Sequence, residues 1–400
     1  MPKKNLKTSV TRTASGFDFA ISSNIRFLNA EHWDQVTSNS SVFLSRAYLE
    51  ASQQEFTGEV LRDFAIIYES NAPVAAVATQ TFDVTGSHLA HAETSNPQDL
   101  PEQLKRKSLA LLKRRIMMCG NVHTWGPHGI AIADGHEQEK VWHGVADCLY
   151  RIRRANRLHG QVDYVMIKDL FEGDNLDATP LKSFRYRPLE TEPNMVLTLN
   201  PQWESMDDYL SSLTKRYRAA AKKVMKPFAS SDLSISPVEN IHSEADKIHE
   251  LYQSVADKAD VCLFGLKATT LPRTSDALGD DFITIGIREK EELIGFVTII
   301  RDGETAVGFY LGMDYGANGR LPVYHALLLS VIEQAIRWRC KNISFGRTAL
   351  DAKSRLGCKP ENVQVWVRHR VPILNFFVQQ ILKNVNHDEP PERNPFKDAS

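Results

Sequence analysis

Three apolar segments in the second half of the chain, separated only by short polar turns, restrict the fold more than any other feature. They are FITIGI (282–287), LIGFVTII (293–300) and AVGFYLGM (306–313), and the turns between them contain REKEE and RDGE. Apolar and β-branched runs bounded by charged or glycine-containing turns are typical of strands. We therefore expect an antiparallel meander, since connections this short join antiparallel neighbours.

A long apolar helix follows this meander. Within VYHALLLSVIEQAIRWRC, residues Val323, Leu327, Val331, Ala335 and Trp338 recur on one face at helical spacing. Pro322 suits the first turn of this helix, because an N–H there has no intrahelical partner. The strands KNISFG (341–346) and NVQVWVRH (362–369) are expected to close the unit.

The first half of the chain repeats this plan, which predicts an internal duplication in a mixed α/β protein. DFAIIYE (63–69) and APVAAVATQTF (72–82) flank Ser70 and Asn71, and this pattern predicts a β-hairpin. A length of 400 residues suits two domains. We expect a flexible N-terminus (1–22), two domains (23–200 and 201–385) and a flexible or surface-draped tail (386–400).

The overall charge argues against a protein whose whole surface binds nucleic acid or an anionic membrane. Lys and Arg number 48 and Asp and Glu 49, so an anionic partner must be bound by a local patch. The five cysteines are scattered and odd in number, which fits a reducing compartment and predicts a cytoplasmic protein. No apolar stretch predicts a signal sequence or a membrane span, so contact with a membrane surface would be transient.

Residues 213–228 combine an apolar stripe with a strongly basic face. The cations are Lys215, Arg216, Arg218, Lys222, Lys223 and Lys226. Like charges at this spacing repel each other by a few tenths of a kcal/mol per pair (~0.3 kcal/mol), so an adjacent anion would stabilise the helix. The segment is either an anion-binding surface, with Arg216, Arg218 and Lys222 in contact with the ligand, or a solvated face balanced by acidic loops.

Two further segments carry residues suited to binding anions. In GANGRLPVY, Asn318, Gly319 and Arg320 form a glycine-bearing bend before a helix, where free N–H groups can hold a phosphate. In FGRTALDAKSRLGCKP (345–360), Arg347 and Lys353 follow a strand and could hold a carboxylate or phosphate. Alternatively, Arg347 pairs with an acidic residue inside the fold and Lys353 begins a surface helix.

No residue pattern predicts a bound metal ion. His123 and His128 flank Trp125 and Gly126 in a loop, but they lack the spacing of metal ligands and are interpreted as turn residues.

The segments LIGFVTII, AVGFYLGMDYGANGRLPVYHALLLSVIEQAIRWRC and FGRTALDAKSRLGCKP resemble the C-terminal unit of bacterial GNAT-fold acyltransferases related to the Fem peptidoglycan aminoacyltransferases. The segments DYLSSLTKRYRAAAKKVMKPF and SVFLSRAYLEA are also similar to parts of such proteins, and the resemblance covers about residues 24 to 385. It implies two GNAT-like domains in tandem. It also implies transfer of an acyl or aminoacyl group to an amine acceptor, with acyl-CoA or aminoacyl-tRNA as the co-substrate, in cell-envelope metabolism.

Two features depart from the family pattern. YGANGRLPVY does not match the CoA pyrophosphate loop [RQ]-x-x-G-x-[GA], and no segment corresponds to the coiled-coil arm with which some Fem enzymes contact tRNA. A non-catalytic GNAT-fold module that binds an anionic ligand or a partner protein therefore remains an alternative. A third hypothesis is tRNA binding through residues 103–115 and 215–226; DNA is not an expected partner.

For an acyltransferase, we expect Tyr310 and Tyr324 to place polar groups near the reacting carbonyl or the leaving group, although both could be core aromatics. We further expect Arg347, Lys353 and the basic helix around Arg216 and Arg218 to surround a single cleft.

Overall fold

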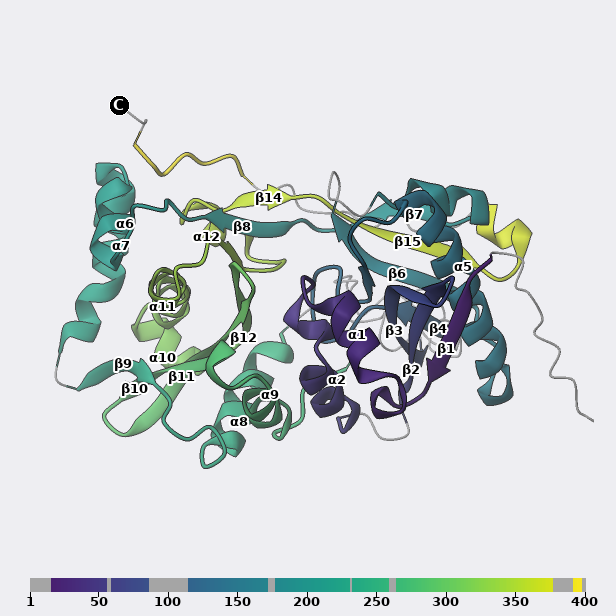
Figure 1. Cartoon of the computed structure of the whole chain (residues 1–400). Coiled ribbons are helices and arrows are strands. Elements are labelled where there is room, and N and C mark those ends of the chain that lie inside the picture. Colours follow the sequence, from purple (N-terminus) through teal and green to yellow (C-terminus); the bar gives the residue numbers. More distant parts are fainter. Residues whose placement is uncertain are drawn as a thin grey trace, which may run out of the picture.

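The computed structural model describes residues 16–55, 59–85, 114–171, 177–230, 232–258, 264–376 and 391–397. Its strands form two mixed sheets that lie side by side along the molecule (Figure 1). The strands of the first sheet are β1 (Asp18–Ser22), β2 (Leu61–Glu69), β3 (Ala72–Val84), β4 (Arg114–Cys119), β5 (Ile130–Ile132), β6 (Tyr164–Phe171), β7 (Arg187–Glu190) and β15 (Val363–His369). Those of the second are β8 (Asn194–Thr198), β9 (Leu233–Pro237), β10 (Phe282–Glu289), β11 (Glu292–Asp302), β12 (Thr305–Met313), β13 (Asn342–Ser344) and β14 (Lys359–Glu361).

Helices cover the faces of both sheets. The α-helices are α1 (Ala30–Thr37), α2 (Arg46–Gln53), α5 (Gln138–Ala155), α6 (Met206–Ser212), α7 (Lys215–Met225), α8 (Ala245–Ala256), α9 (Thr270–Leu278), α10 (Tyr315–Arg320), α11 (Val323–Arg337) and α12 (Leu350–Ser354). Short 3-10 helices are η1 (Ile25–Phe27), η2 (Val42–Leu44), η3 (Asn156–His159), η4 (Thr179–Phe184), η5 (Lys226–Ala229) and η6 (Gly279–Asp281).

The two halves of the chain exchange one strand each. The first sheet runs β1-β2-β3-β4-β6-β15-β7 and the second β14-β8-β13-β12-β11-β10-β9, so β15 is inserted between β6 and β7, and β8 between β13 and β14. The expectation that residues 362–369 close the second unit is therefore wrong, because this strand pairs with β6 and β7 of the first sheet. Conversely, β8 lies within the range 23–200 but pairs in the second sheet. Each half thus completes the sheet of the other.

The predicted hairpins and the meander are present. Ser70 and Asn71 join β2 to β3 with φ of 50° and 70°, the left-handed conformation that a tight two-residue hairpin turn requires. Strands β10, β11 and β12 pair antiparallel in sequence order. Local sequence patterns were sufficient here because each strand pairs with its neighbour along the chain.

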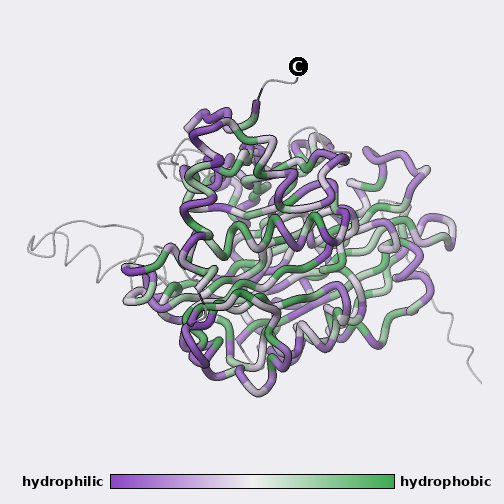
Figure 2. The backbone as a smooth tube through the Cα atoms, turned by 90° about the vertical axis from the view of Figure 1, so that its left-hand side faces the viewer, coloured by the Kyte–Doolittle hydropathy of each residue, from purple (hydrophilic) through white to green (hydrophobic). Residues whose placement is uncertain are grey.

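Apolar residues from both halves form one continuous core between the sheets. Trp33, Phe43 and Phe64 of the first half belong to the same buried cluster as Phe296 and Phe309 of the second. The tube in Figure 2 shows the sheet strands as largely hydrophobic and many of the outer loops as hydrophilic. Burial of this shared core holds the two units together.

Both ends of the described chain contain ordered segments that the sequence did not predict. Asp18–Ser22, expected within the flexible N-terminus, forms β1 and pairs with β2. Residues 391–397, in the predicted flexible tail, lie against the second unit: the backbone N–H of Thr214 donates to the Pro395 carbonyl at 2.8 Å. Of the two expectations for the tail, this part matches the surface-draped one.

Among the described residues, no helix is both long enough and apolar enough to cross a bilayer.

Candidate functional site

The loops that follow two parallel strand pairs meet at the junction between the sheets. In the first sheet β4 pairs in parallel with β6, and in the second β12 pairs in parallel with β13. The loop after β4 carries Trp125, whose indole Nε1 donates to Oγ of Ser344 at the end of β13 (3.1 Å). A Cβ on Gly346 would lie 2.8 Å from the Trp125 ring, so only glycine allows this close contact.

Asp169 is the buried anion of this junction site, which we define as Trp125, Lys168, Asp169, Arg347 and Lys353. Its side chain is 0% exposed, and its backbone is left-handed (φ 57°) at an irregularity in the β6–β15 register. Such strained conformations are concentrated at functional sites.

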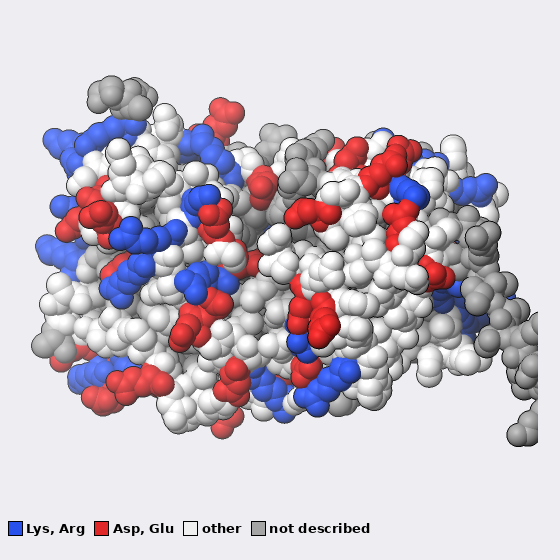
Figure 3. Space-filling view, in the orientation of Figure 1, with Lys and Arg blue, Asp and Glu red and all other residues white. Residues whose placement is uncertain are grey.

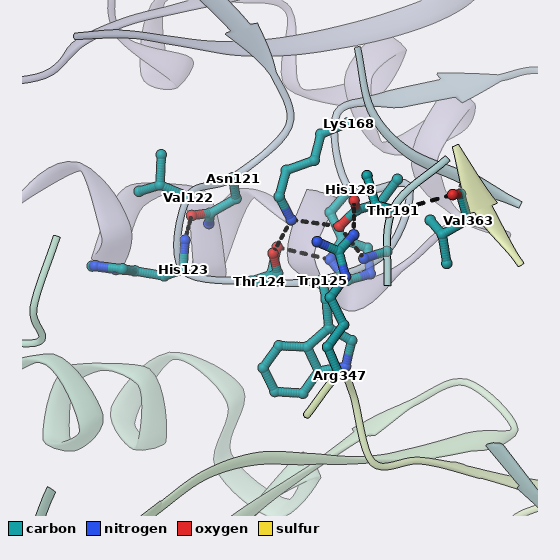
Figure 4. A network of polar contacts seen from close by, with 12 residues as sticks. Asn121, Val122, His123, Thr124, Trp125, His128, Lys168, Thr191, Arg347 and Val363 are labelled. Atoms are coloured by element: carbon teal, nitrogen blue, oxygen red, sulfur yellow. Dashed lines mark hydrogen bonds and ion pairs between the residues drawn. The ribbon is translucent and has the colours of Figure 1, made fainter. Parts of the chain in front are cut away.

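The Asp169 carboxylate has three partners, of which Lys168 and Arg347 are labelled in Figure 4. It accepts a hydrogen bond from the Gly126 N–H (3.1 Å), lies 2.5 Å from Nζ of Lys168, and forms an ion pair with Nη2 of Arg347. Burial alone would raise the pKa of Asp169, but Lys168 and Arg347 outweigh this effect and the pKa is lowered. The carboxylate is therefore ionised and fixes both cations.

Arg347 keeps part of its binding capacity free. A guanidinium has five N–H donors. Its Nη2 binds Asp169, whereas its Nε is buried and has no hydrogen-bond partner among the described residues. The side chain as a whole is 27% exposed, so part of it faces solvent although Nε does not. Of the two interpretations of Arg347, the ion pair inside the fold is present, but it does not use all the donors.

Lys353 lies behind Arg347 and is only 4% exposed. Its Nζ donates to the backbone carbonyls of Gly346 (3.2 Å) and Arg347. Burial lowers the pKa of Lys353 to about 8, with Cys358 and Glu192 acting in the opposite direction. The alternative that Lys353 begins a surface helix is wrong for its side chain, because α12 directs it inward onto the Arg347 backbone.

Cationic and acidic side chains meet in this region, and Oδ2 of Asp302 lies 3.9 Å from Nε2 of the neighbouring His128. Lys168, Arg347 and Lys353 are cationic, whereas Asp169 and, near Lys353, Glu192 are anionic. Burial lowers the pKa of the neighbouring His128 to about 3, so its imidazole is neutral. A carboxylate or phosphate bound beside Arg347 would accept charged hydrogen bonds from its guanidinium.

Tyr310 lies beside the junction site, on β12. Its hydroxyl donates to the backbone carbonyl of His123 at 3.0 Å, and its ring contacts Trp125 edge to face. Burial lowers the pKa of His123 to about 4, so this imidazole is neutral as well. Tyr310 therefore links β12 of the second unit to the loop after β4 of the first.

The bend 316–320 is not the open phosphate seat that the sequence predicted. It forms the short helix α10, which Asp314 caps. Arg320 points to Glu289 and makes two hydrogen bonds with it (3.0 and 2.9 Å), and the Asn318 side chain accepts from the N–H of Tyr324 (3.0 Å). Gly319 has open space around its Cα. Tyr324 packs against the core of the second unit, and burial raises its pKa to about 12.

The basic helix α7 does not reach the junction site. Figure 1 shows α7 at the outer end of the second unit, and Lys and Arg side chains gather at this edge in Figure 3. Arg216 and Lys222 are exposed, and Arg218 is half-buried. The expectation of one cleft lined by all the cations is therefore wrong: Arg347 and Lys353 do come together, whereas α7 faces water elsewhere. Of the other basic segment, residues 103–113 lie outside the described residues.

Sequence reasoning did not select Lys168, Asp169 or Trp125. A signal was available, because Lys168 and Asp169 directly follow the apolar residues 164–167, and polar residues at strand ends commonly contact ligands. The pairing of Asp169 with Arg347, 178 positions further on, could not be predicted from the sequence.

No protein-family model matches the chain, and no curated protein sequence matches it. Among solved structures, FemX has a TM-score of 0.56 and 10% sequence identity, over 88% of this chain and 98% of that one. A tandem GNAT protein from the clavulanic acid biosynthesis pathway has a TM-score of 0.49 and 11% sequence identity, over 89% of this chain and 99% of that one. The C-terminal domain of a putative lysylphosphatidylglycerol synthetase from Agrobacterium fabrum has a TM-score of 0.48 and 9% sequence identity, over 89% of this chain and 97% of that one.

The likeness to FemX confirms the expected fold. The chain is a mixed α/β protein that consists of two GNAT-like units in tandem, in the Fem-related arrangement. At this level of identity the likeness concerns the fold alone.

Proposed function

We propose that this protein is an N-acyltransferase that moves an acyl or aminoacyl group from an activated donor to an amine acceptor. The donor would be an acyl-CoA or similar thioester, with aminoacyl-tRNA as the alternative. We further propose that the reaction belongs to cell-envelope metabolism and takes place in the cytoplasm. The observation that carries the proposal is the partly exposed Arg347 at the junction of two GNAT-like units, whose buried Nε lacks a partner among the described residues.

In this proposal Arg347 binds an anionic group of the donor or acceptor. Asp169, which itself binds Lys168, holds the guanidinium in place, so little side-chain freedom is lost when the ligand binds. Holding two reactants together supplies much of the acceleration in such a transfer. The amine nitrogen forms a bond to the carbonyl carbon, the bond from that carbon to the leaving thiol or tRNA hydroxyl breaks, and the proton lost by the amine passes to the leaving group. Tyr310, beside the junction site, is the side chain that we propose to act on the oxyanion or the leaving group.

The alternative is a binding module without catalytic activity. It is favoured by Trp125, which fills the space at the end of β13, and by the Tyr310 hydroxyl, which already donates to a backbone carbonyl. A module would bind the same anion but would release no product.

Binding of CoA thioesters, measured by calorimetry and by thermal shift, tests the anion site. A ligand present at a hundredfold excess over its Kd stabilises a protein by ~2.7 kcal/mol. We expect Arg347→Gln to weaken binding by about tenfold or more, because a charged hydrogen bond contributes ~1.5–3 kcal/mol. Arg320→Gln is the matched control, since Arg320 is exposed and pairs with Glu289.

Equal affinities for Arg347→Gln and the wild type would refute the anion site. Mass spectrometry of the wild-type protein mixed with a bound thioester and a panel of amines then separates the two functions. An N-acylated amine supports the transferase, whereas binding without product supports the module.

A further inference from the structure

The C-terminal segment 391–397 is anchored to the second unit by an aromatic side chain. The Phe396 ring packs against Trp203 and Tyr209, with ring centroids 5.7 and 6.2 Å away, and Phe396 forms an antiparallel bridge with Leu213. Phe396 is half-buried against the core of the second unit, and the preceding Pro395 is buried. An aromatic ring that packs on other rings contributes more than the polar contacts of an exposed tail.

Backbone and side-chain hydrogen bonds extend this contact between α6 and α7. Besides the bond from Thr214 to the Pro395 carbonyl, the N–H of Lys397 donates to the Ser212 carbonyl at 3.0 Å. Nζ of Lys397 donates to the Ser211 carbonyl at 2.7 Å. The segment is therefore held by defined main-chain pairing, as in strand-addition complexes.

The same segment contacts α12 and the turn after it. Arg393 donates to Oδ1 of Asp351 (2.9 Å from Nε), while Arg355 of the same helix donates to Oδ2 (2.8 Å). Gly357 has a φ of 99°, and a Cβ there would lie 2.3 Å from the Phe396 ring. The contacts at Asp351 and Gly357 lie on either side of Lys353 along the chain.

We propose that residues 391–397 act as a strap that fixes α12 and, through Lys353, the Arg347 arm of the junction site. The mechanical path is short. The strap binds Asp351 and packs on Gly357, Lys353 lies between these positions, and its Nζ holds the carbonyls of Gly346 and Arg347. Release of the strap loosens α12 and with it the turn that presents Arg347. The tail thereby couples the outer end of the second unit to the junction between the units.

Hydrogen exchange of the full-length chain tests the strap directly. Phe396→Ala removes the anchor and Arg393→Ala removes the ion pair with Asp351. We expect amide exchange in peptides covering 350–358 to accelerate by about tenfold in Phe396→Ala and about threefold in Arg393→Ala. Arg355→Ala is the matched control, because it removes the other partner of Asp351 and leaves the contacts of residues 391–397 in place. We expect amide exchange at Thr214 to change by less than about twofold in this variant.

Two outcomes would overturn the inference. If the Thr214 amide loses protection against exchange in Phe396→Ala while the amides of residues 350–358 keep their protection, the strap binds the second unit but does not hold α12. If neither segment changes, Phe396 is not an anchor. Should Phe396→Ala fail to fold, Arg393→Ala and the conservative Phe396→Leu give the same comparison.

A second experiment measures ligand binding, and its interpretation rests on the proposed function. We expect Arg393→Ala to weaken thioester binding by about threefold, less than Arg347→Gln does. If no thioester binds the wild type, the proposed function fails while the exchange result still decides the strap. If the wild type binds and Arg393→Ala binds equally well despite faster exchange at 350–358, the coupling to Arg347 is wrong.

Discussion

The buried amine of Lys353 should make the free energy of unfolding depend on pH. Burial lowers its pKa from 10.5 to about 8 in the folded protein. Between these two values the unfolded chain holds a proton that the folded protein has lost, so the free energy of unfolding rises with pH. The full effect is about 3 kcal/mol, from 2.5 pKa units at ~1.36 kcal/mol each. About 2 kcal/mol of it falls between about pH 7.5 and about pH 10.

The assay is urea denaturation of the wild type and of Lys353→Met over this pH range. Methionine keeps the length of the side chain but cannot titrate, so the difference in free energy of unfolding between the two proteins isolates this one amine. We expect the wild type to gain about 2 kcal/mol relative to the variant from about pH 7.5 to about pH 10. Lys341→Met, at an exposed lysine of the same unit, controls for the loss of one positive charge.

A difference between wild type and Lys353→Met that stays constant across this range would refute the reasoning. Lys353 would then titrate alike in the folded and unfolded chains, and its amine would not be desolvated behind Arg347.

Three further predictions concern stability. Asp169→Asn leaves Lys168 and the partly exposed Arg347 without the buried carboxylate that they share. It should lower the free energy of unfolding by about 3 kcal/mol or more, measured by denaturation, and a loss below about 1 kcal/mol would contradict these ion pairs. Gly357→Ala should lower the free energy of unfolding by about 1–3 kcal/mol, because of the positive φ of Gly357 and its contact with Phe396. The loss should be smaller when Phe396 is also changed to Ala, and equal losses in the two backgrounds would exclude that contact. Tyr310→Phe should lower the free energy of unfolding by about 1 kcal/mol, because the hydrogen bond to the His123 carbonyl is lost. An unchanged midpoint of urea denaturation would argue against that hydrogen bond.

Strands, turns and the central helix could be predicted because their causes are local. Apolar segments separated by short turns predicted the hairpin at Ser70 and Asn71 and the meander 282–313, and helical spacing predicted the helix that runs over Val323–Arg337. Each depends on contacts between residues close in the chain, so the residue pattern itself carries the information.

The partner of a strand was not determined in this way. Residues 362–369 were predicted to be a strand of the second unit, and β8 (Asn194–Thr198) falls within the range predicted for the first domain, yet each joins the sheet formed mainly by the other half. Apolar periodicity specifies that a strand must be buried but not which sheet edge buries it. The exchange is decided by the arrangement of the whole chain.

The same distinction applies to the candidate site. The sequence by itself marked Arg347 and Lys353 as charged residues beyond a strand, but only the tertiary structure placed Arg347 on Asp169, Lys353 on the Arg347 carbonyl and α7 at a distant edge. Electrostatic attraction depends on distance and burial, and neither is contained in the order of residues. Residue types therefore determined which charges this protein carries, and packing decided which of them act together.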